Sequence, residues 1–380
     1  MRNVAVVFGG KSCENEISII TGIFVMNVLD KEKYCVFPVY IHTDGGIYTS
    51  PKMRDLKIFQ EKKYALFERI FFDGGSMYAL NASKGKIKRI AKMDVAINCC
   101  HGGLGEGGGV SAMMAWNEIP LASPGLTPSG VFLDKCLTKV VAQGLGIPTL
   151  EYVRVNEEDY RKRGAFLLKR IAAKLKYPVV IKPAHLGSSI GISVARTEEE
   201  VKKRIEEAFA LDGRVLIEKY LEHKEDVNCA VYESKGGIYV SEPERAFGQG
   251  IYTFEDKYLR KENVEKEGRN AEKISSYGRG RCVMNEEVRK KIRAYTKTIY
   301  KRMNLKGVVR MDYLTSGDKV YLCEVNTVPG SLAYYLFCER LTDAQLFFGD
   351  LLEEAIEKAK KEEKKLLTTG ILKNGPGMRK

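Results

Sequence analysis

The chain has 380 residues, of which 44% are hydrophobic and 29% charged, so its composition excludes a fibrous or largely disordered protein. This length predicts two or three domains, at about 150 residues per domain. Lysine and arginine total 62 against 49 aspartate and glutamate, a net charge of +13. Nucleic acid, an anionic membrane surface or small anionic substrates would each suit a basic chain. Because the excess is scattered rather than interleaved with aromatic residues, we expect no nucleic-acid partner.

Nothing in the sequence predicts a membrane or export segment. No stretch reaches about 18 uninterrupted apolar residues, so we expect no membrane partner. Glu14 and Glu16 stand just before the apolar stretch 17–29, where a secretory signal would have basic residues. The nine cysteines form no CxxC pair, and the four histidines lack zinc-finger spacing, which argues against disulfides or structural zinc. Cysteines used as small apolar residues fit a reducing cytoplasm, where we place the protein.

The first 125 residues alternate predicted strands and helices and form the first expected domain. Strands are expected at 4–8, 34–41 and 94–100, and a helix at 16–30. This alternation is typical of a parallel sheet covered by helices, which binds ligands at the carboxyl ends of its strands. The glycine-rich turns after Phe8 and Cys100 lie at such ends.

Two further domains, 126–225 and 226–365, and a basic flexible tail, 366–380, complete the expected organisation. For the middle domain we expect helices at 127–145 and 198–211, with strands at 179–183, 192–194 and 215–218. For the last domain we expect strands at 226–232 and 237–240, helices at 285–303 and 342–365, and a hairpin at 307–324. The long polar stretch 243–281 has no clear period, which is typical of a lid or a disordered segment.

Several motifs are ambiguous by themselves. The stretch 9–12 resembles the end of a P-loop, but Ala5 stands where the first glycine is required, so we reject that interpretation. Taken alone, Glu14 is explained better by the dipole of the helix that follows it than by a function. The glycine-rich turn 102–109 permits close approach to a ligand, or it merely turns the chain. Lys182 and the loop after it suit phosphate oxygens, but an exposed lysine before an ordinary loop is an equal alternative.

The most informative pattern lies in the expected hairpin. If residue 310 pairs with 326 and 312 with 324, side-chain alternation places four polar groups on one face. These groups are Arg310, Asp312, Glu324 and Asn326. A slip of one residue would split them between faces. The chosen register is supported by the apolar set it places on the other face, Val309, Met311, Tyr313, Cys323 and Val325.

Two carboxylates and an amide oxygen at this spacing predict a Mg²⁺ site with bound phosphates. The adjacent Arg310 would hold a developing oxyanion or a substrate carboxylate. A solvated polar face with a surface ion pair is the alternative. It does not explain why a turn, 327–330, follows at once and could place backbone N–H groups in the same site, so we favour a functional site.

Taken in order, these segments resemble the ATP-grasp ligases, and most closely the D-alanine–D-alanine ligases. The resemblance spans about residues 4–358, and the matching stretches are 8–18, 101–107, 133–135, 180–183, 187–191, 216–221, 255–258, 310–312 and 324–330. It implies an α/β ATP-grasp fold with an α+β C-terminal part and three domains. ATP would be held between the central and C-terminal domains, and the 243–281 stretch would be the omega loop that closes over the phosphates.

The resemblance also implies roles for individual residues. At the ATP phosphates it implies Lys135, Lys182, Ser188, Ser189 and Lys257; at the adenine Glu218, Lys219, Tyr220 and Leu221; at the ribose Glu225. Two Mg²⁺ ions, with Mn²⁺ as an alternative, would be held by Asp312, Glu324 and Asn326. The first D-alanine would be bound by Glu14 near His101, with a link from Glu14 through Ser188 to Tyr258. Arg310 and the backbone N–H of Gly330 would stabilise the oxyanion.

The implied activity is ATP-dependent joining of two D-alanine molecules through an acyl phosphate, for peptidoglycan precursor synthesis, by a homodimer. Four positions depart from the family pattern: Gly107, His185 and Leu186, and Tyr335, which stands where a serine helps bind the second substrate. The alternative is therefore the same chemistry with another acceptor amino acid or hydroxy acid, although Tyr258 favours a dipeptide. A regulatory module without catalysis, or a nucleic-acid binder, is disfavoured by the intact polar set of the hairpin.

Overall fold

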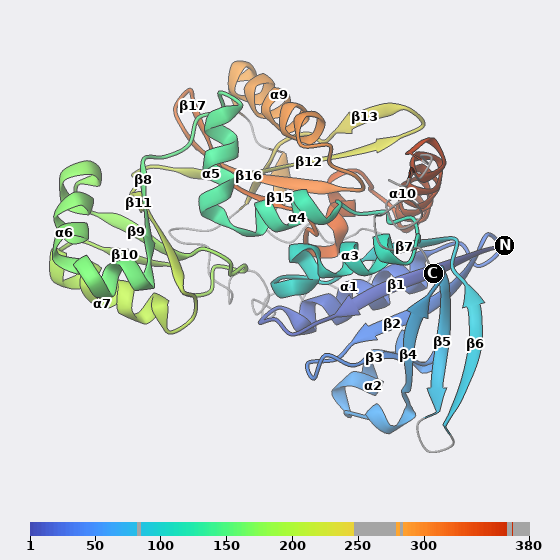
Figure 1. Cartoon of the computed structure of the whole chain (residues 1–380). Helices are drawn as coiled ribbons and strands as arrows, with labels where there is room; N and C mark the ends of the chain where they lie inside the picture. The colour runs from blue at the N-terminus through green and yellow to red at the C-terminus, as the bar shows by residue number, and fades with distance from the viewer. Residues whose placement is uncertain (82–84, 247–278, 282–283, 363–366, 368–380) are drawn as a thin grey trace, which may run out of the picture.

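The computed structural model describes residues 1–81, 85–246, 279–281, 284–362 and 367, which form three sheets with helices packed against them (Figure 1). In the N-terminal sheet the described strands follow the order β6-β5-β4-β3-β2-β1-β7. They are β1 (Arg2–Gly9), β2 (Tyr34–Ile41), β3 (Ile47–Thr49), β4 (Glu68–Asp73), β5 (Ser76–Asn81), β6 (Lys86–Lys92) and β7 (Val95–Asn98). Strand β1 runs parallel to β2 and β7, which confirms the predicted parallel arrangement.

Strands β3 to β6 extend this sheet as antiparallel hairpins that the sequence did not predict. In β6 most residues are exposed and basic, so this strand lacks the apolar period by which a strand is recognised. The helices of this part are α1 (Asn15–Val28), α2 (Leu56–Gln60) and α3 (Val110–Trp116), with short 3-10 turns at Pro51–Arg54 and Tyr64–Leu66 and a π-helical turn at Gly105–Gly109.

The central sheet has the order β10-β9-β11-β8. Its strands are β8 (Tyr152–Asn156), β9 (Val179–Pro183), β10 (Ser193–Ala195) and β11 (Arg214–Lys219). Helices α6 (Glu157–Leu175) and α7 (Glu198–Phe209) bury one face of this sheet in a shared apolar core. The opposite face of this sheet carries Lys182 and Glu218, which contact Cys323 of the C-terminal sheet and Lys139, respectively.

The helix expected at 127–145 is broken into α4 (Leu126–Leu133) and α5 (Lys135–Gly144), so that prediction was wrong in one respect. Asp134 leaves the helical conformation, and its side chain accepts hydrogen bonds from the backbone N–H groups of Cys136 and Leu137. An aspartate in this position caps a new helix, which begins at Lys135. Helix α5 therefore aims its first turn, with Lys135, at the central sheet.

The C-terminal sheet has the order β15-β14-β12-β16-β17, and β13 pairs with β12. Its strands are β12 (Glu225–Ser234), β13 (Gly237–Val240), β14 (Glu244–Ala246), β15 (Arg279–Arg281), β16 (Val309–Ser316) and β17 (Lys319–Asn326). The helical segments are α9 (Glu286–Arg302), the 3-10 segment Gly330–Leu336 and α10 (Leu341–Glu362). The ends of the expected omega loop thus pair as β14 and β15, and its remainder lies outside the described residues.

Two apolar cores tie these parts together. In the first, Val4 and Val6 of β1 pack with Phe347 and Phe348 of α10, so the beginning and the end of the chain share a core. In the second, helices α4 and α5 pack on the apolar face of β16 and β17. No helix among the described residues is long and apolar enough to cross a bilayer. Helix α4 contacts the π-helical turn Gly105–Gly109, and both α4 and α5 contact β17, so these two helices lie against the hairpin (Figure 1).

Candidate active site

The β16–β17 hairpin has the predicted register, with Arg310 opposite Asn326 and Asp312 opposite Glu324. The Arg310 guanidinium donates from Nε to Asp312 Oδ1 at 2.7 Å and from Nη2 to Asp312 Oδ2 at 2.9 Å. Asn326 Nδ2 also donates to Asp312 Oδ2, at 2.9 Å. Burial opposes the charge on Arg310, but the Asp312 carboxylate prevails and raises the pKa of the guanidinium well above its usual value. The polar face is therefore an ordered, charged cluster.

Cys323 departs from the prediction that it lies on the core face. The pairing shifts after Asp312, so that Tyr313 lies opposite Leu322 and Cys323 has no partner strand residue. Such a bulge turns the extra residue away from its expected side. Leu322 takes the place in the core, and the Cys323 thiol lies 3.6 Å from Lys182 Nζ, on the side of the site.

Lys135 and Lys182, the two predicted phosphate-binding lysines, lie against this hairpin. Lys135 Nζ donates to the carbonyl of Leu186 at 2.5 Å and lies 3.6 Å from Glu324 Oε2. Lys182 Nζ lies 2.6 Å from Glu218 Oε2. Lys135 thus joins helix α5 to the hairpin, whereas Lys182 and Glu218 pair within the central sheet.

The Glu218 carboxylate is almost fully buried between two lysines. Its other oxygen, Oε1, lies 2.7 Å from Nζ of Lys139, which also donates to the carbonyl of Leu322 at 2.9 Å. Burial would raise the pKa of Glu218, but the two ammonium groups hold it well below its usual value. Burial would likewise lower the pKa of Lys182, but Cys323 and Glu218 raise it. Glu218 and Lys182 are therefore both charged at neutral pH.

Glu14, at the start of α1, is joined to the loop 184–192 between β9 and β10, which is the predicted phosphate loop. The hydroxyl of Ser188 donates to Glu14 Oε1, and both side chains are buried. Two glycines make room for this carboxylate. A Cβ at Gly102 would lie 2.7 Å from Glu14 Oε2, and one at Gly187 would collide with the same group. Gly102 also has φ +66°, a conformation that favours glycine.

His101 and Glu106 connect the glycine-rich turn to the loop after β17. The His101 ring is hydrogen-bonded to the hydroxyl of Thr21 and to the carbonyl of Val328, both at 2.8 Å. Burial lowers the pKa of His101 to about 4, so the ring is neutral at pH 7. The Glu106 carboxylate accepts from the backbone N–H of Gly102 at 2.8 Å and of Val328 at 3.3 Å. Burial raises its pKa to about 7.

Tyr335 lies beside the hairpin, within reach of the predicted acceptor site. Arg310 Nη1 donates to the Tyr335 hydroxyl at 3.2 Å. The segment between Gly330 and this tyrosine is strained, because Ser331, Leu332 and Ala333 all have φ near +50°. Each non-glycine residue in this conformation costs about 1–2 kcal/mol. The hydrogen bond from Arg310 places Tyr335 where the family pattern has a smaller residue.

The remaining predicted residues are less closely joined to this cluster. Glu225 is ion-paired with Arg245, and Lys219 lies 3.9 Å from Glu151. Ser189, Tyr220 and Leu221 are half-buried along the same edge, and Ser189 has φ +60°. Lys257 and Tyr258 lie outside the described residues. The adenine, ribose and omega-loop assignments therefore stay predictions.

Lys139 was missed by sequence reasoning, although a signal was present. It follows Lys135 by four residues in α5, and this spacing places two side chains on the same helix face. A second missed feature is the contact of His185, in the predicted phosphate loop, with two carboxylates. Its ring lies 3.0 Å from Asp212 and 3.4 Å from Asp134, and we call this group the anchor of the loop. Hydrogen bonds to these carboxylates raise the pKa of His185 to about 9.

The chemistry of the hairpin face fits a divalent cation that binds oxygen. Asp312, Glu324 and Asn326 supply two carboxylates and an amide, the ligand types of Mg²⁺. Within the described ranges no group of three or more His, Cys, Asp or Glu side chains is arranged to hold a metal.

Comparison with known proteins identifies the family. The model described as "D-ala D-ala ligase N-terminus" matches residues 3–124, and "D-ala D-ala ligase C-terminus" matches residues 141–357. The D-alanine–D-alanine ligase of Thermosipho africanus is 32% identical over 345 residues, 89% of this chain and 88% of the relative. That of Caldicellulosiruptor bescii is 32% identical over 363 residues, 94% of each chain.

Solved structures agree with this result. The Helicobacter pylori D-alanine–D-alanine ligase superposes with a TM-score of 0.72 at 25% identity, over 96% of this chain and 100% of that one. The fold is shared with the Coxiella burnetii ligase, with a TM-score of 0.76 at 22% identity, over 95% and 97% of the chains. It is also shared with a Bacillus anthracis ligase complexed with ATP, with a TM-score of 0.63 at 19% identity, over 96% and 100%. The chain belongs to the D-alanine–D-alanine ligase family and has its ATP-grasp fold.

Proposed function

We propose that this ligase joins two D-alanine molecules at the expense of ATP, with Mg²⁺ as cofactor, for peptidoglycan precursor synthesis in the cytoplasm. The observation that carries the proposal is the convergence of three groups of side chains. Lys135 and Lys182 approach from the central domain, the Asp312–Glu324–Asn326 face from the C-terminal hairpin, and Glu14 from the N-terminal domain.

The first step is attack of the first D-alanine carboxylate on the γ-phosphorus of ATP, which gives an acyl phosphate and ADP. Glu14 holds the ammonium of this substrate, and the neutral ring of His101 lies nearby without adding a charge. Lys135 and Lys182 counter the negative charge that moves between the phosphates. Asp312, Glu324 and Asn326 would hold Mg²⁺, which supplies further positive charge to the phosphate oxygens when bound.

The second step is attack of the acceptor's free amine on the acyl carbonyl, after which phosphate leaves. Arg310 would stabilise the negative charge on the carbonyl oxygen, together with the backbone N–H of Gly330. The Asp312 carboxylate keeps the Arg310 guanidinium in place by two hydrogen bonds. Exclusion of water protects the acyl phosphate from hydrolysis.

A different acceptor is the second candidate, and Tyr335 is the observation that favours it. Its hydroxyl is bonded to Arg310, and its ring takes up more volume than the serine of the family pattern. The phenol could donate a hydrogen bond to an acceptor carboxylate, as a serine would, but it leaves less space beside it. Two bound Mg²⁺ ions, use of Mn²⁺ and a homodimeric assembly remain predictions from the family.

The experiment that tests the proposal is phosphate release with ATP, Mg²⁺ and single or paired D- and L-amino acids and D-hydroxy acids. Products are identified by mass. We expect release with D-alanine alone, accompanied by the dipeptide. Release only when a second compound is paired with D-alanine would favour the other acceptor, and no release with any pair would refute ligase activity.

A further inference from the structure

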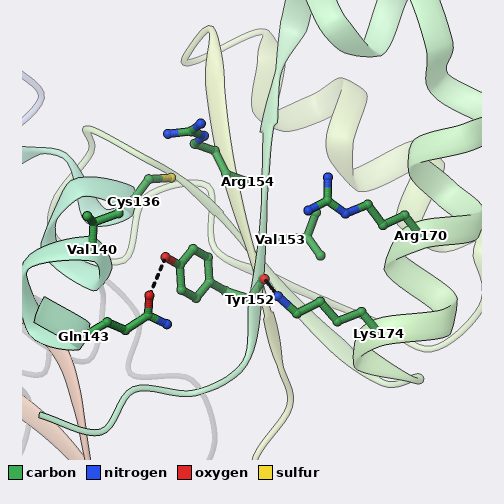
Figure 2. A pocket seen from close by; sticks show the side chains of 8 residues that line it. All are labelled: Cys136, Val140, Gln143, Tyr152, Val153, Arg154, Arg170 and Lys174. Carbon is green, nitrogen blue, oxygen red and sulfur yellow. Dashed lines mark hydrogen bonds between the residues drawn. The ribbon is translucent and has the colours of Figure 1, made fainter. Parts of the chain in front are cut away.

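A cavity of about 320 Å³ lies where α5, β8 and α6 meet, apart from the predicted catalytic residues. Figure 2 shows the side chains that line it. Three of them are basic: Arg154 on β8 and Arg170 and Lys174 on α6. No aspartate or glutamate lines the cavity. Its size is within the range of pockets that hold small ligands, about 300–1,000 Å³.

The two arginines of this cavity lack the ion-pair partners that the basic residues at the beginning of α6 have. At the beginning of α6, Arg161, Lys162 and Arg163 each form an ion pair with a carboxylate. Among the described residues no carboxylate lies within ion-pair distance of Arg154 or Arg170. The positive charge of the arginines in the lining is therefore not compensated by an ion pair within the part of the chain that the structure describes.

The other walls of the cavity are neutral and partly fixed. Lys174 Nζ donates to the carbonyl of Tyr152 at 3.0 Å and lies 5.7 Å from the centre of its ring. The Tyr152 hydroxyl contacts Gln143 Oε1 at 3.5 Å, as the dashed line in Figure 2 shows. Burial raises the pKa of the Cys136 thiol to about 12, so this wall carries no negative charge. Nothing in the lining repels an anion.

We propose that this cavity binds a small phosphorylated ligand, with its phosphoryl oxygens held by Arg154, Arg170 and Lys174. Guanidinium groups bind phosphate in a forked, two-bond geometry, and an ammonium adds a third charge. Two or three cations around a space of this size match a compact anion with two or three charges better than an extended polyanion.

The site is separate from the nucleotide site but shares two elements with it. Helix α5 carries Lys135 and Lys139 on one face, and Cys136 and Gln143 about a quarter turn around the helix. In the central sheet Tyr152 lies opposite Glu218, the carboxylate held by Lys139 and Lys182. A ligand in the cavity would therefore touch the supports of the phosphate-binding lysines without touching ATP.

The test is binding of inorganic pyrophosphate, measured by calorimetry in excess Mg²⁺ with the nucleotide site first saturated by a non-hydrolysable ATP analogue. We expect one further binding event, weakened at high salt. Arg154→Gln and Arg170→Gln should each weaken it about tenfold. Lys169→Gln removes a charge from the same helix outside the cavity and should leave it unchanged.

Three outcomes would overturn the proposal. One is absence of binding once the nucleotide site is full, and another is equal binding by the wild type and both arginine variants at unchanged melting temperature. The third is variant-sensitive binding of an acidic peptide but not of pyrophosphate, which would assign the cavity to a protein partner. Two further titrations identify the kind of ligand. Variant-sensitive binding of ATP, added in excess over the analogue, would indicate a second nucleotide, and variant-sensitive binding of a sugar phosphate would indicate another phosphorylated metabolite.

Discussion

At the scale of single residues, the Lys139–Glu218–Lys182 group is the most constrained part of the site. The Glu218 side chain is 1% exposed, and both of its oxygens lie within 2.7 Å of an ammonium nitrogen. Three charges without water are stable only while each has its partner. Glu218 therefore fixes the position of Lys182, the lysine that we propose binds phosphate.

Replacement of Lys139 by methionine should destabilise the fold and weaken ATP binding. Removing one member of a buried charged group typically costs about 3–5 kcal/mol, because its partner is left without compensation. Glu218 would then draw Lys182 more strongly and away from phosphate. Urea denaturation and the KM for ATP measure the two effects. Lys203→Met, at an exposed position of α7, is the matched control. A wild-type unfolding midpoint for the Lys139 variant would contradict this account.

At the scale of elements, the phosphate loop is anchored to the first turn of α5. Asp134 caps this helix, is bonded to Arg214, and faces His185 of the loop; Asp212 faces the other side of the same ring. The loop that holds Ser188 and the helix that holds Lys135 are thereby fixed to each other. Charged His185 is the central member of this anchor.

The anchor predicts a pH dependence of stability. Folding raises the pKa of His185 from 6.5 to about 9 through Asp134 and Asp212. A raised pKa means that the folded state binds the proton more tightly, so the stabilisation is complete below pH 6.5 and disappears as the pH rises through 9. His185→Gln should therefore melt below the wild type at pH 6, and the difference should vanish near pH 10.

The measurement is thermal unfolding of both proteins from pH 5.5 to 10. His223→Gln, at an exposed position without these carboxylates, should show no such trend. A difference between His185→Gln and wild type that stays constant over this range would exclude the charged histidine as the cause.

At the scale of the whole molecule, three contacts hold the domains around one site. Glu14 meets Ser188, Glu106 meets Val328, and Lys135 meets Glu324. Each contact joins residues far apart in the sequence, and each involves a group with a proposed role in binding or positioning substrates. The apolar cores lie behind these contacts, so the charged groups can be changed without opening a core.

Glu324→Ala tests this separation of site and scaffold. We expect Mg²⁺-dependent phosphate release to fall by at least about 10²-fold, because the variant loses a proposed metal ligand. The melting temperature should change little, since the Glu324 side chain is 24% exposed and lies outside the cores. Glu357→Ala, on the exposed face of α10, should retain full activity. Wild-type turnover of the Glu324 variant would refute the metal assignment.

The sequence predicted the hairpin register because the signal is local. Apolar and polar residues alternate in 309–314 and 320–326, which gives the hairpin one apolar and one polar face. A slip of the pairing by one residue would have turned charged side chains into the core. Cys323 shows the limit of this reasoning, since a bulge is set by contacts on both sides of the sheet. Strand β6 was missed for a different reason, because its exposed, basic residues carry no apolar period.

The sequence itself determined the order of the motifs and the polar face of the hairpin. It also determined the types of those elements that have a clear apolar period, because these features depend on neighbours within a few residues. Tertiary structure alone decided three features: the ion pairs of Glu218 with Lys139 and Lys182, the contacts of His185 with Asp134 and Asp212, and the basic cavity beside α5. Each of these features depends on burial and on charged side chains brought together from distant segments. A local stretch of sequence shows neither how deeply a side chain is buried nor which distant side chain lies next to it.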